Sequence, residues 1–241
     1  MTLPSAHQLY DVVEGTWPPA SRRIVGPWTI REGLGAGSRV SATTANETVS
    51  ATDLFSANSA MRDIGQPCLF MIRDGDGDLD ALLESVGYVI RDPVNLRAVP
   101  IDELARDRSP DHMTFEVWPP LAAQLDVWEE GHIGPARVAV MERARGPKTT
   151  ILGRVGNTPA GTMYVAMHNG IAMFHALEVS KDHRRKGLAQ AMVRAAGFWA
   201  NAQGATHMSC VVTQANSGAN ALYASLGFAL VGQYHYRIKP E

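Results

Sequence analysis

Residues 184–189, Arg-Arg-Lys-Gly-Leu-Ala, combine the residue types that bind a diphosphate. They follow an apolar segment, Ile171–Val179, that predicts a strand, and they open a segment whose apolar spacing predicts an amphipathic helix. Backbone N–H groups at a helix start have no intrahelical partner, and the helix dipole adds partial positive charge there. Gly187 lets the backbone approach a ligand closely, and two arginines and a lysine add full positive charge. The segment therefore predicts a pyrophosphate site at a strand–turn–helix junction.

Two other nucleotide-binding motifs do not fit this segment. A Walker loop needs two glycines followed by Lys-Ser/Thr, and the dinucleotide fingerprint needs three glycines, whereas the segment holds one. The segment matches Arg/Gln-x-x-Gly-x-Gly/Ala instead. Downstream, Asn216–Tyr223 and Gly227-Phe228 match Asn-x-x-Ala-x-x-Leu-Tyr-x-x-x-Gly-Phe at full spacing, and upstream Leu177-Glu178-Val179 ends the strand. In this order the three elements resemble the GNAT acetyltransferase superfamily, over about residues 113–241.

The resemblance implies the α+β GNAT fold, a mixed and mostly antiparallel sheet flanked by helices. It also implies direct transfer of an acetyl group from acetyl-CoA to an amine, with no metal. The acyl-CoA would lie where the strands Ile171–Val179 and His207–Thr213 splay apart. The implied coenzyme-binding residues are Leu177, Val179, Arg184, Arg185, Lys186, Gly187, Leu188, Ala189 and Asn216.

The resemblance also implies roles for individual groups. The backbone of Leu177 and Val179 would bind the pantetheine arm, and the Val179 N–H would polarise the thioester carbonyl. Tyr223 occupies the family's position for the acid that protonates the leaving thiolate. For the base we expect Glu178, with His175 and a water relay as alternatives. Asn216 fits a helix N-cap as well as a ligand contact.

An internal sequence repeat predicts two related domains. Ala81–Tyr88 aligns without gaps with Ala221–Phe228. In the first copy Leu83 stands in place of Tyr223, and the stretch aligned with the basic loop, 44–49, has neither glycine nor cation. We therefore expect residues 1–112 to be a degenerate GNAT-like domain and residues 113–241 to be the catalytic domain. A chance match between two helix–glycine–strand units is the alternative.

Hydrophobic periodicity, proline and glycine predict the elements that carry these residues. We expect helices at 5–15, 52–64, 79–86, 121–130, 135–145 and 187–203. We expect strands at 27–32, 39–43, 68–73, 88–100, 150–155, 161–168, 171–179, 207–213 and 229–238. Asn169-Gly170 predicts a two-residue hairpin turn, and Asp107–Asp111 predicts a linker.

Two further motifs favour turns over ligand sites. Gly33–Ser38 resembles a phosphate loop, but the strand-like residues after it predict a hairpin turn. Asp74–Asp78 resembles the start of a calcium loop but has Leu79 at the sixth position and Ser85 at the twelfth, so we expect a turn with Asp78 capping the next helix. The sequence has no zinc-like Cys/His spacing.

Composition limits the class of partner. The 241 residues carry a formal net charge of −2, which does not favour nucleic acid or an anionic membrane. No signal peptide or membrane-spanning run is evident, and Cys68 and Cys210 lie in apolar runs, so we expect a cytoplasmic protein with buried thiols.

Three functions remain open at this stage. The leading one is an N-acetyltransferase that acts on a small-molecule or exposed protein amine. A non-catalytic acyl-CoA sensor is the second. The third gives residues 1–112 only a scaffolding role, in a homodimer or as a wall of the acceptor cleft.

Overall fold

A computed structural model describes residues 2–106 and 113–240; the expected linker at 107–111 lies outside the described residues. The helices are α1 (Ala6–Thr16), α2 (Ser38–Ser41), α3 (Asp53–Asp63), α4 (Gly77–Ser85), α5 (Ile101–Leu104), α6 (Ala122–Glu130), α7 (Pro135–Arg143), α8 (Leu188–Ala202) and α9 (Ser217–Ser225), with a 3₁₀ turn at Lys181–His183. The strands are β1 (Ser21–Val25), β2 (Trp28–Glu32), β3 (Thr44–Ala45), β4 (Leu69–Ile72), β5 (Val89–Pro100), β6 (Met113–Val117), β7 (Lys148–Val155), β8 (Thr158–His168), β9 (Ile171–Val179), β10 (His207–Thr213) and β11 (Ala229–Ile238).

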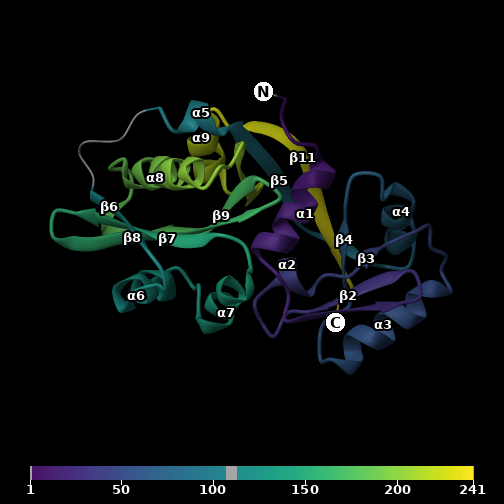
Figure 1. Cartoon of the computed structure of the whole chain (residues 1–241). Helices are drawn as coiled ribbons and strands as arrows, with labels where there is room; N and C mark the ends of the chain where they lie inside the picture. The colour runs from purple at the N-terminus through teal and green to yellow at the C-terminus, as the bar shows by residue number, and fades with distance from the viewer. Residues whose placement is uncertain (1, 107–112, 241) are drawn as a thin grey trace.

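An eight-stranded mixed sheet forms the centre of the molecule, in the order β4-β11-β5-β10-β9-β8-β7-β6 (Figure 1). Only β9 and β10 pair in parallel in this sheet, as the crossover through α8 predicts. Helices α5, α8 and α9 cover one face, and α6 and α7 cover the other (Figure 1). The expected α+β architecture is therefore confirmed.

The two halves of the chain share this sheet. Strand β5, which belongs to the first half of the sequence, lies between β10 and β11 and pairs antiparallel with both. Strand β11 in turn lies between β5 and β4. A smaller sheet, β1-β2-β3, adjoins β4 through a single parallel bridge from Thr43 to Phe70.

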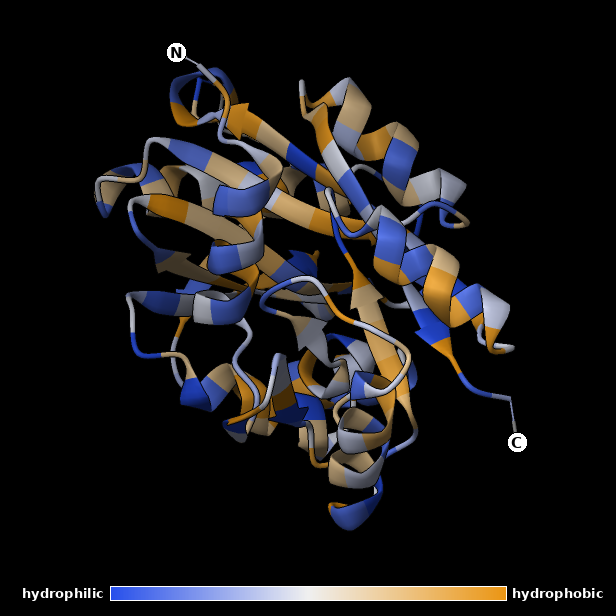
Figure 2. Ribbon diagram, turned by 90° about the vertical axis from the view of Figure 1, so that its right-hand side faces the viewer, coloured by the Kyte–Doolittle hydropathy of each residue, from blue (hydrophilic) through white to orange (hydrophobic). Residues whose placement is uncertain are grey.

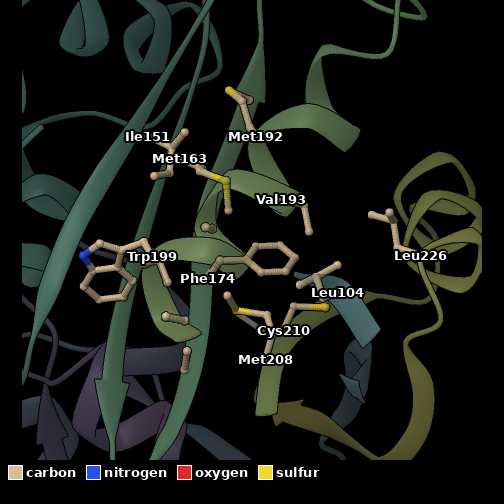
Figure 3. Close-up of a cluster of buried hydrophobic side chains, with 14 of the residues drawn as sticks. Leu104, Ile151, Met163, Phe174, Met192, Val193, Trp199, Met208, Cys210 and Leu226 are labelled. Carbon is tan, nitrogen blue, oxygen red and sulfur yellow. The ribbon is translucent and has the colours of Figure 1, made fainter. Parts of the chain in front are cut away.

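The main core lies between α8 and the sheet. Phe174, Met192 and Met208 meet there, all at most 3% exposed (Figure 3). Gly153 and Gly161 allow this close packing, because a Cβ on either would lie within 3 Å of Met192. The covering helices carry both hydrophilic and hydrophobic residues, as amphipathic elements do (Figure 2).

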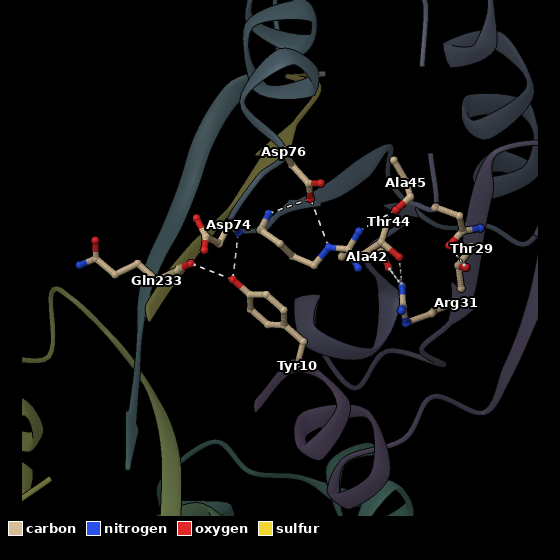
Figure 4. A network of polar contacts seen from close by, with 11 residues as sticks. Tyr10, Thr29, Arg31, Ala42, Thr44, Ala45, Asp74, Asp76 and Gln233 are labelled. Atoms are coloured by element: carbon tan, nitrogen blue, oxygen red, sulfur yellow. Dashed lines mark hydrogen bonds and ion pairs between the residues drawn. The ribbon is translucent and has the colours of Figure 1, made fainter. Parts of the chain in front are cut away.

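Polar contacts attach α1 to strands of both halves (Figure 4). The Tyr10 hydroxyl donates to the Gln233 carbonyl at 3.1 Å and accepts from the Asp74 N–H at 3.0 Å. Arg73 donates to Asp76 at 3.2 Å and to the Ala45 carbonyl at 2.6 Å. The Tyr10 bonds fix α1 against β11 and the turn after β4, and the Arg73 bonds hold that turn against β3.

Most predicted elements are confirmed, including the Asn169-Gly170 turn, where both residues have positive φ. The strand predicted at 39–43 is wrong: Ser38–Ser41 form one helical turn, because Gly33 packs so tightly that an added Cβ would lie 2.1 Å from Ser41 Oγ. The hairpin predicted around Gly33–Ser38 is therefore also wrong; the hairpin of this region joins β1 to β2 and turns at Gly26-Pro27. Asp76, not Asp78, precedes α4 as its N-cap residue.

Candidate active site

Strands β9 and β10 separate halfway along their length. Their parallel pairing covers Ile171–Phe174 and His207–Cys210 and goes no further. Beyond it a cavity of about 190 Å³ opens, lined by residues of both strands and of α9, among them Leu177, Thr213 and Tyr223. The predicted splay between these strands is thus present, although larger cavities lie elsewhere on the surface.

A bulge in β9 shapes one wall of this gap. The register with β8 shifts between His175 and Glu178, and Ala176 has a φ of +53°. The Trp128 indole N–H donates to the Ala176 carbonyl at 2.7 Å and holds the bulge in place. The interrupted ladder leaves the backbone of Ala176 and Leu177 at the cavity wall.

The basic loop has the conformation of an anion site. Arg185 and Gly187 have φ values of +62° and +82°, and successive amides in such alternating conformations form a concave nest. Hydrogen bonding within α8 begins with the Ala191 N–H on the Gly187 carbonyl, so the amides of Leu188 and Ala189 precede it. Gly187 and its preceding cations are exposed to solvent.

Two of the three cations also hold the loop itself together. Arg184 donates to the Val179 carbonyl and to Glu178 Oε1, both at 2.9 Å. Lys186 Nζ donates to the Asp182 carbonyl at 2.9 Å. Arg184 therefore joins the loop to the end of β9.

Tyr223 reaches the gap from α9. Its side chain is 6% exposed and packs edge-on against Phe174, with ring centroids 5.2 Å apart. Burial raises the pKa of its hydroxyl well above the usual value, so the hydroxyl stays protonated at neutral pH. Among the described residues it makes no hydrogen bond, which leaves its proton available to a group in the gap.

The two candidate bases lie in different surroundings. Glu178 is paired with Arg184 and packs on Gly131, where a Cβ would lie 2.6 Å from its Oε2, and it does not line the gap cavity. His175 lines the cavity, and burial and the neighbouring Arg39 hold its pKa well below 6.5.

Asn216 serves as the N-cap of α9, since its side chain accepts from the Ala219 N–H at 3.0 Å. It lines the gap cavity as well. The Val179 N–H, expected to polarise the thioester, lies 3.2 Å from Glu178 Oε1.

The sequence analysis missed three residues that the fold brings to this site. Trp17, Arg39 and Arg137 line a second cavity of about 240 Å³ that adjoins the gap. Arg39 escaped notice because it lay in a predicted strand, and no local pattern marks the other two.

The described residues contain no helix long and apolar enough to cross a bilayer. Within the same part of the chain, no group of three His, Cys, Asp or Glu side chains is placed to hold a metal ion.

Comparisons with known proteins agree with this geometry. The chain is 25% identical to the Uncharacterized N-acetyltransferase YobR of Bacillus subtilis (strain 168), over 93% of this chain and 94% of that protein. A GCN5-related N-acetyltransferase from Kribbella flavida has a similar structure (TM-score 0.76, 17% identity, 100% of this chain and 97% of that one). So does a tandem GNAT protein from the clavulanic acid biosynthesis pathway (TM-score 0.62, 12% identity, 93% and 85%). Residues 102–228, more than half of the chain, match the Acetyltransferase (GNAT) family, and the chain therefore belongs to that family.

Proposed function

We propose that this GNAT protein transfers an acetyl group from acetyl-CoA to the amine of a small molecule or of an exposed protein residue, in the cytoplasm. One observation carries the proposal: the gap between β9 and β10 has the buried hydroxyl of Tyr223 on one side, and the basic loop begins where β9 ends. The loop amides would bind the diphosphate. The backbone of Leu177 and Val179 would bind the pantetheine arm.

In the proposed reaction the amine attacks the thioester carbonyl and the C–S bond breaks. The Val179 N–H would stabilise the charge on the carbonyl oxygen, and Tyr223 would give its proton to the leaving sulfur. Glu178 would accept the proton of the amine, which requires its ion pair with Arg184 to open or a water to relay the proton. His175 is the competing base, because it lines the gap and is neutral.

The test combines binding with turnover. Calorimetry with acetyl-CoA and release of CoA with an amine panel are both expected to be positive. Binding without turnover of any amine would favour a sensor, and no heat from CoA or its thioesters would overturn the assignment. Comparing Glu178→Gln with His175→Gln then separates the two bases, since only loss of the base removes the rise of kcat with pH.

We also propose that residues 1–112 are a degenerate copy of the catalytic unit. The pairing register supports this. The two copies are offset by 140 residues, the distance from Ala81 to Ala221. In β4 and β11, Leu69 pairs with Ile238. The residue 140 positions after Leu69 is Ser209, and the residue 140 positions before Ile238 is Ala98. These two residues also pair, in β10 and β5. The copies would thus have exchanged their last strands across a pseudo-twofold axis.

A further inference from the structure

The second cavity, which we name the outer cavity, is built largely by the first half of the chain. Its lining includes Trp17 after α1, Arg39 in α2 and Asp92 in β5, together with Arg137 from α7. It continues into the gap, because Arg39, Ala176 and Thr213 line both cavities. A molecule in the outer cavity therefore lies beside the proposed acetyl-transfer site.

Two guanidinium groups face this space without a carboxylate partner. Among the described residues, neither Arg39 nor Arg137 forms an ion pair. The Arg39 Nε is buried and has no hydrogen-bond partner. The bond of Arg137 to the His132 carbonyl is long, at 3.4 Å. Burial and the neighbouring Arg39 charge lower the pKa of Arg137, as expected for two unneutralised cations.

A buried relay orients Arg39. The Thr16 hydroxyl donates to the Val12 carbonyl at 2.6 Å, so it must accept from His175 Nε2 at 2.9 Å. His175 Nδ1 then carries no proton and accepts from Arg39 at 3.0 Å. The guanidinium also lies 5.7 Å from the centroid of the Trp17 ring. A guanidinium held this firmly at the cavity, with no carboxylate partner, is preorganised for an anionic ligand.

The only acidic side chain among the described lining residues is Asp92. It is half exposed and pairs with Arg91 at 3.5 Å. It therefore does not neutralise the two arginines, and the net charge of the outer cavity favours an anion.

We propose that the acceptor is an amine that carries a carboxylate, such as a small amino acid, and that Arg39 and Arg137 hold that carboxylate in the outer cavity. This inference rests on the proposed function, because the gap must be where the amine reacts. Planar guanidinium groups match the two oxygens of a carboxylate, which favours this group over a neutral polar one. The volume, about 240 Å³, suits a small acceptor.

The test compares amines in matched pairs. CoA release from acetyl-CoA is measured with glycine against glycinamide and with L-phenylalanine against L-phenylalaninamide. We expect kcat/KM to be about 10- to 100-fold higher for an acid than for its amide. Arg137→Gln is expected to lower kcat/KM for each acid to about that for its amide. Arg145→Gln, an exposed arginine outside the outer cavity, is the control and should keep the ratio.

Three outcomes would overturn the inference. In the first outcome, the wild type uses acids and amides equally. In the second, Arg137→Gln lowers the turnover of both equally, as a purely structural role predicts. In the third, Arg137→Gln slows transfer from succinyl-CoA but leaves the ratio between acid and amide unchanged. The carboxylate would then belong to the acyl donor.

Calorimetry separates this inference from the proposed function. N-acetylglycine, the expected product, is titrated into the protein with CoA present, against N-acetylglycinamide. Binding of the acid that depends on Arg137, in a protein that acetylates nothing, would support the carboxylate site while overturning the proposed function. Equal binding of both compounds would overturn the carboxylate site.

Discussion

The chain contains two strand–turn–helix junctions at corresponding places in its halves, one before α8 and one before α3. Before α8, Gly187 and its cations leave the helix start open to an anion. Before α3, the protein supplies its own anion: Asp53 Oδ2 accepts from the Ser50 N–H at 2.8 Å and from the Ser50 hydroxyl at 2.6 Å. These bonds lower the pKa of Asp53, so its carboxylate stays charged in the first turn of α3. The comparison teaches that the two junctions differ in charge, since one carries cations in its loop and the other a carboxylate in the first turn of its helix.

A second contrast concerns what each half does for the other. The first half has no tyrosine that corresponds to Tyr223, since Leu83 lies fully buried at the matching position of α4. It nevertheless contributes β5 to the centre of the sheet and Arg39 to the site. The first half therefore completes the sheet to which the second half belongs and contributes Arg39 to the outer cavity.

The largest effect is expected from separating the halves. Residues 113–241 expressed alone lack β5, so β10 and β11 lose their common neighbour and expose their edges. We expect this fragment to be unfolded, as judged by circular dichroism and NMR dispersion. Co-expression with residues 1–112 should restore the fold. A folded fragment on its own would contradict the interdependence of the halves.

Tyr223→Phe is expected to have the next largest effect. Loss of the proton donor should lower kcat by about 10²-fold or more, with little change in the KM for acetyl-CoA. Steady-state kinetics measure both constants. The matched control in the other half is Tyr88→Phe, whose hydroxyl bonds Asn58 at 2.7 Å far from the gap and should leave kcat unchanged. Full activity of the Tyr223→Phe variant would remove this residue from the mechanism.

Gln190→Asp should make the junction before α8 resemble the junction before α3, because it places a carboxylate in the first turn of the helix. A carboxylate at this exposed third residue of α8 would lie in the first turn of the helix, as Asp53 does in α3, and would compete with a diphosphate for the free amides. We expect the Kd for acetyl-CoA to rise about 10-fold, while the helix dipole keeps the melting temperature equal or higher. Gln190→Asn, without charge, should bind normally. Equal affinities for the two variants would show that the amides do not hold the diphosphate.

The smallest expected effect concerns stability against pH. His175 follows the last residue of β9 that pairs in parallel with β10, and it is neutral because burial and Arg39 hold its pKa below 6.5. In the first half, the residue that follows the parallel bridge from Thr43 to Phe70 is Thr44, whose side chain does not titrate. Below pH 6.5 the unfolded chain binds a proton that the folded chain does not, so the free energy of unfolding falls as pH falls. The slope is at most about 1.4 kcal/mol per pH unit. Urea denaturation between pH 5 and 7 should show a flatter dependence for His175→Gln, and an unchanged slope would mean that His175 titrates normally.

The sequence by itself determined the features that depend on neighbouring residues. Asn169-Gly170 fixes a hairpin through positive φ, and the spacing around Gly187 and Tyr223 places a basic loop before α8 and a tyrosine on α9, with β10 between the two helices. Such features follow from local conformational preferences and from helix and strand periodicity, which short segments carry in full. The parallel pairing of β9 and β10 followed in the same way, from the crossover helix between them.

Only the tertiary structure decided which residues of the first half lie beside the gap. The position of β5 between β10 and β11, the helical turn that contains Arg39 and the meeting of Arg39 with Arg137 at one cavity join residues far apart in sequence. No local pattern encodes such contacts, because they arise from long-range strand pairing and from the close packing of Gly33 on Ser41. The basic loop and Tyr223 therefore lie in contiguous sequence motifs, whereas the outer cavity forms only in the folded chain.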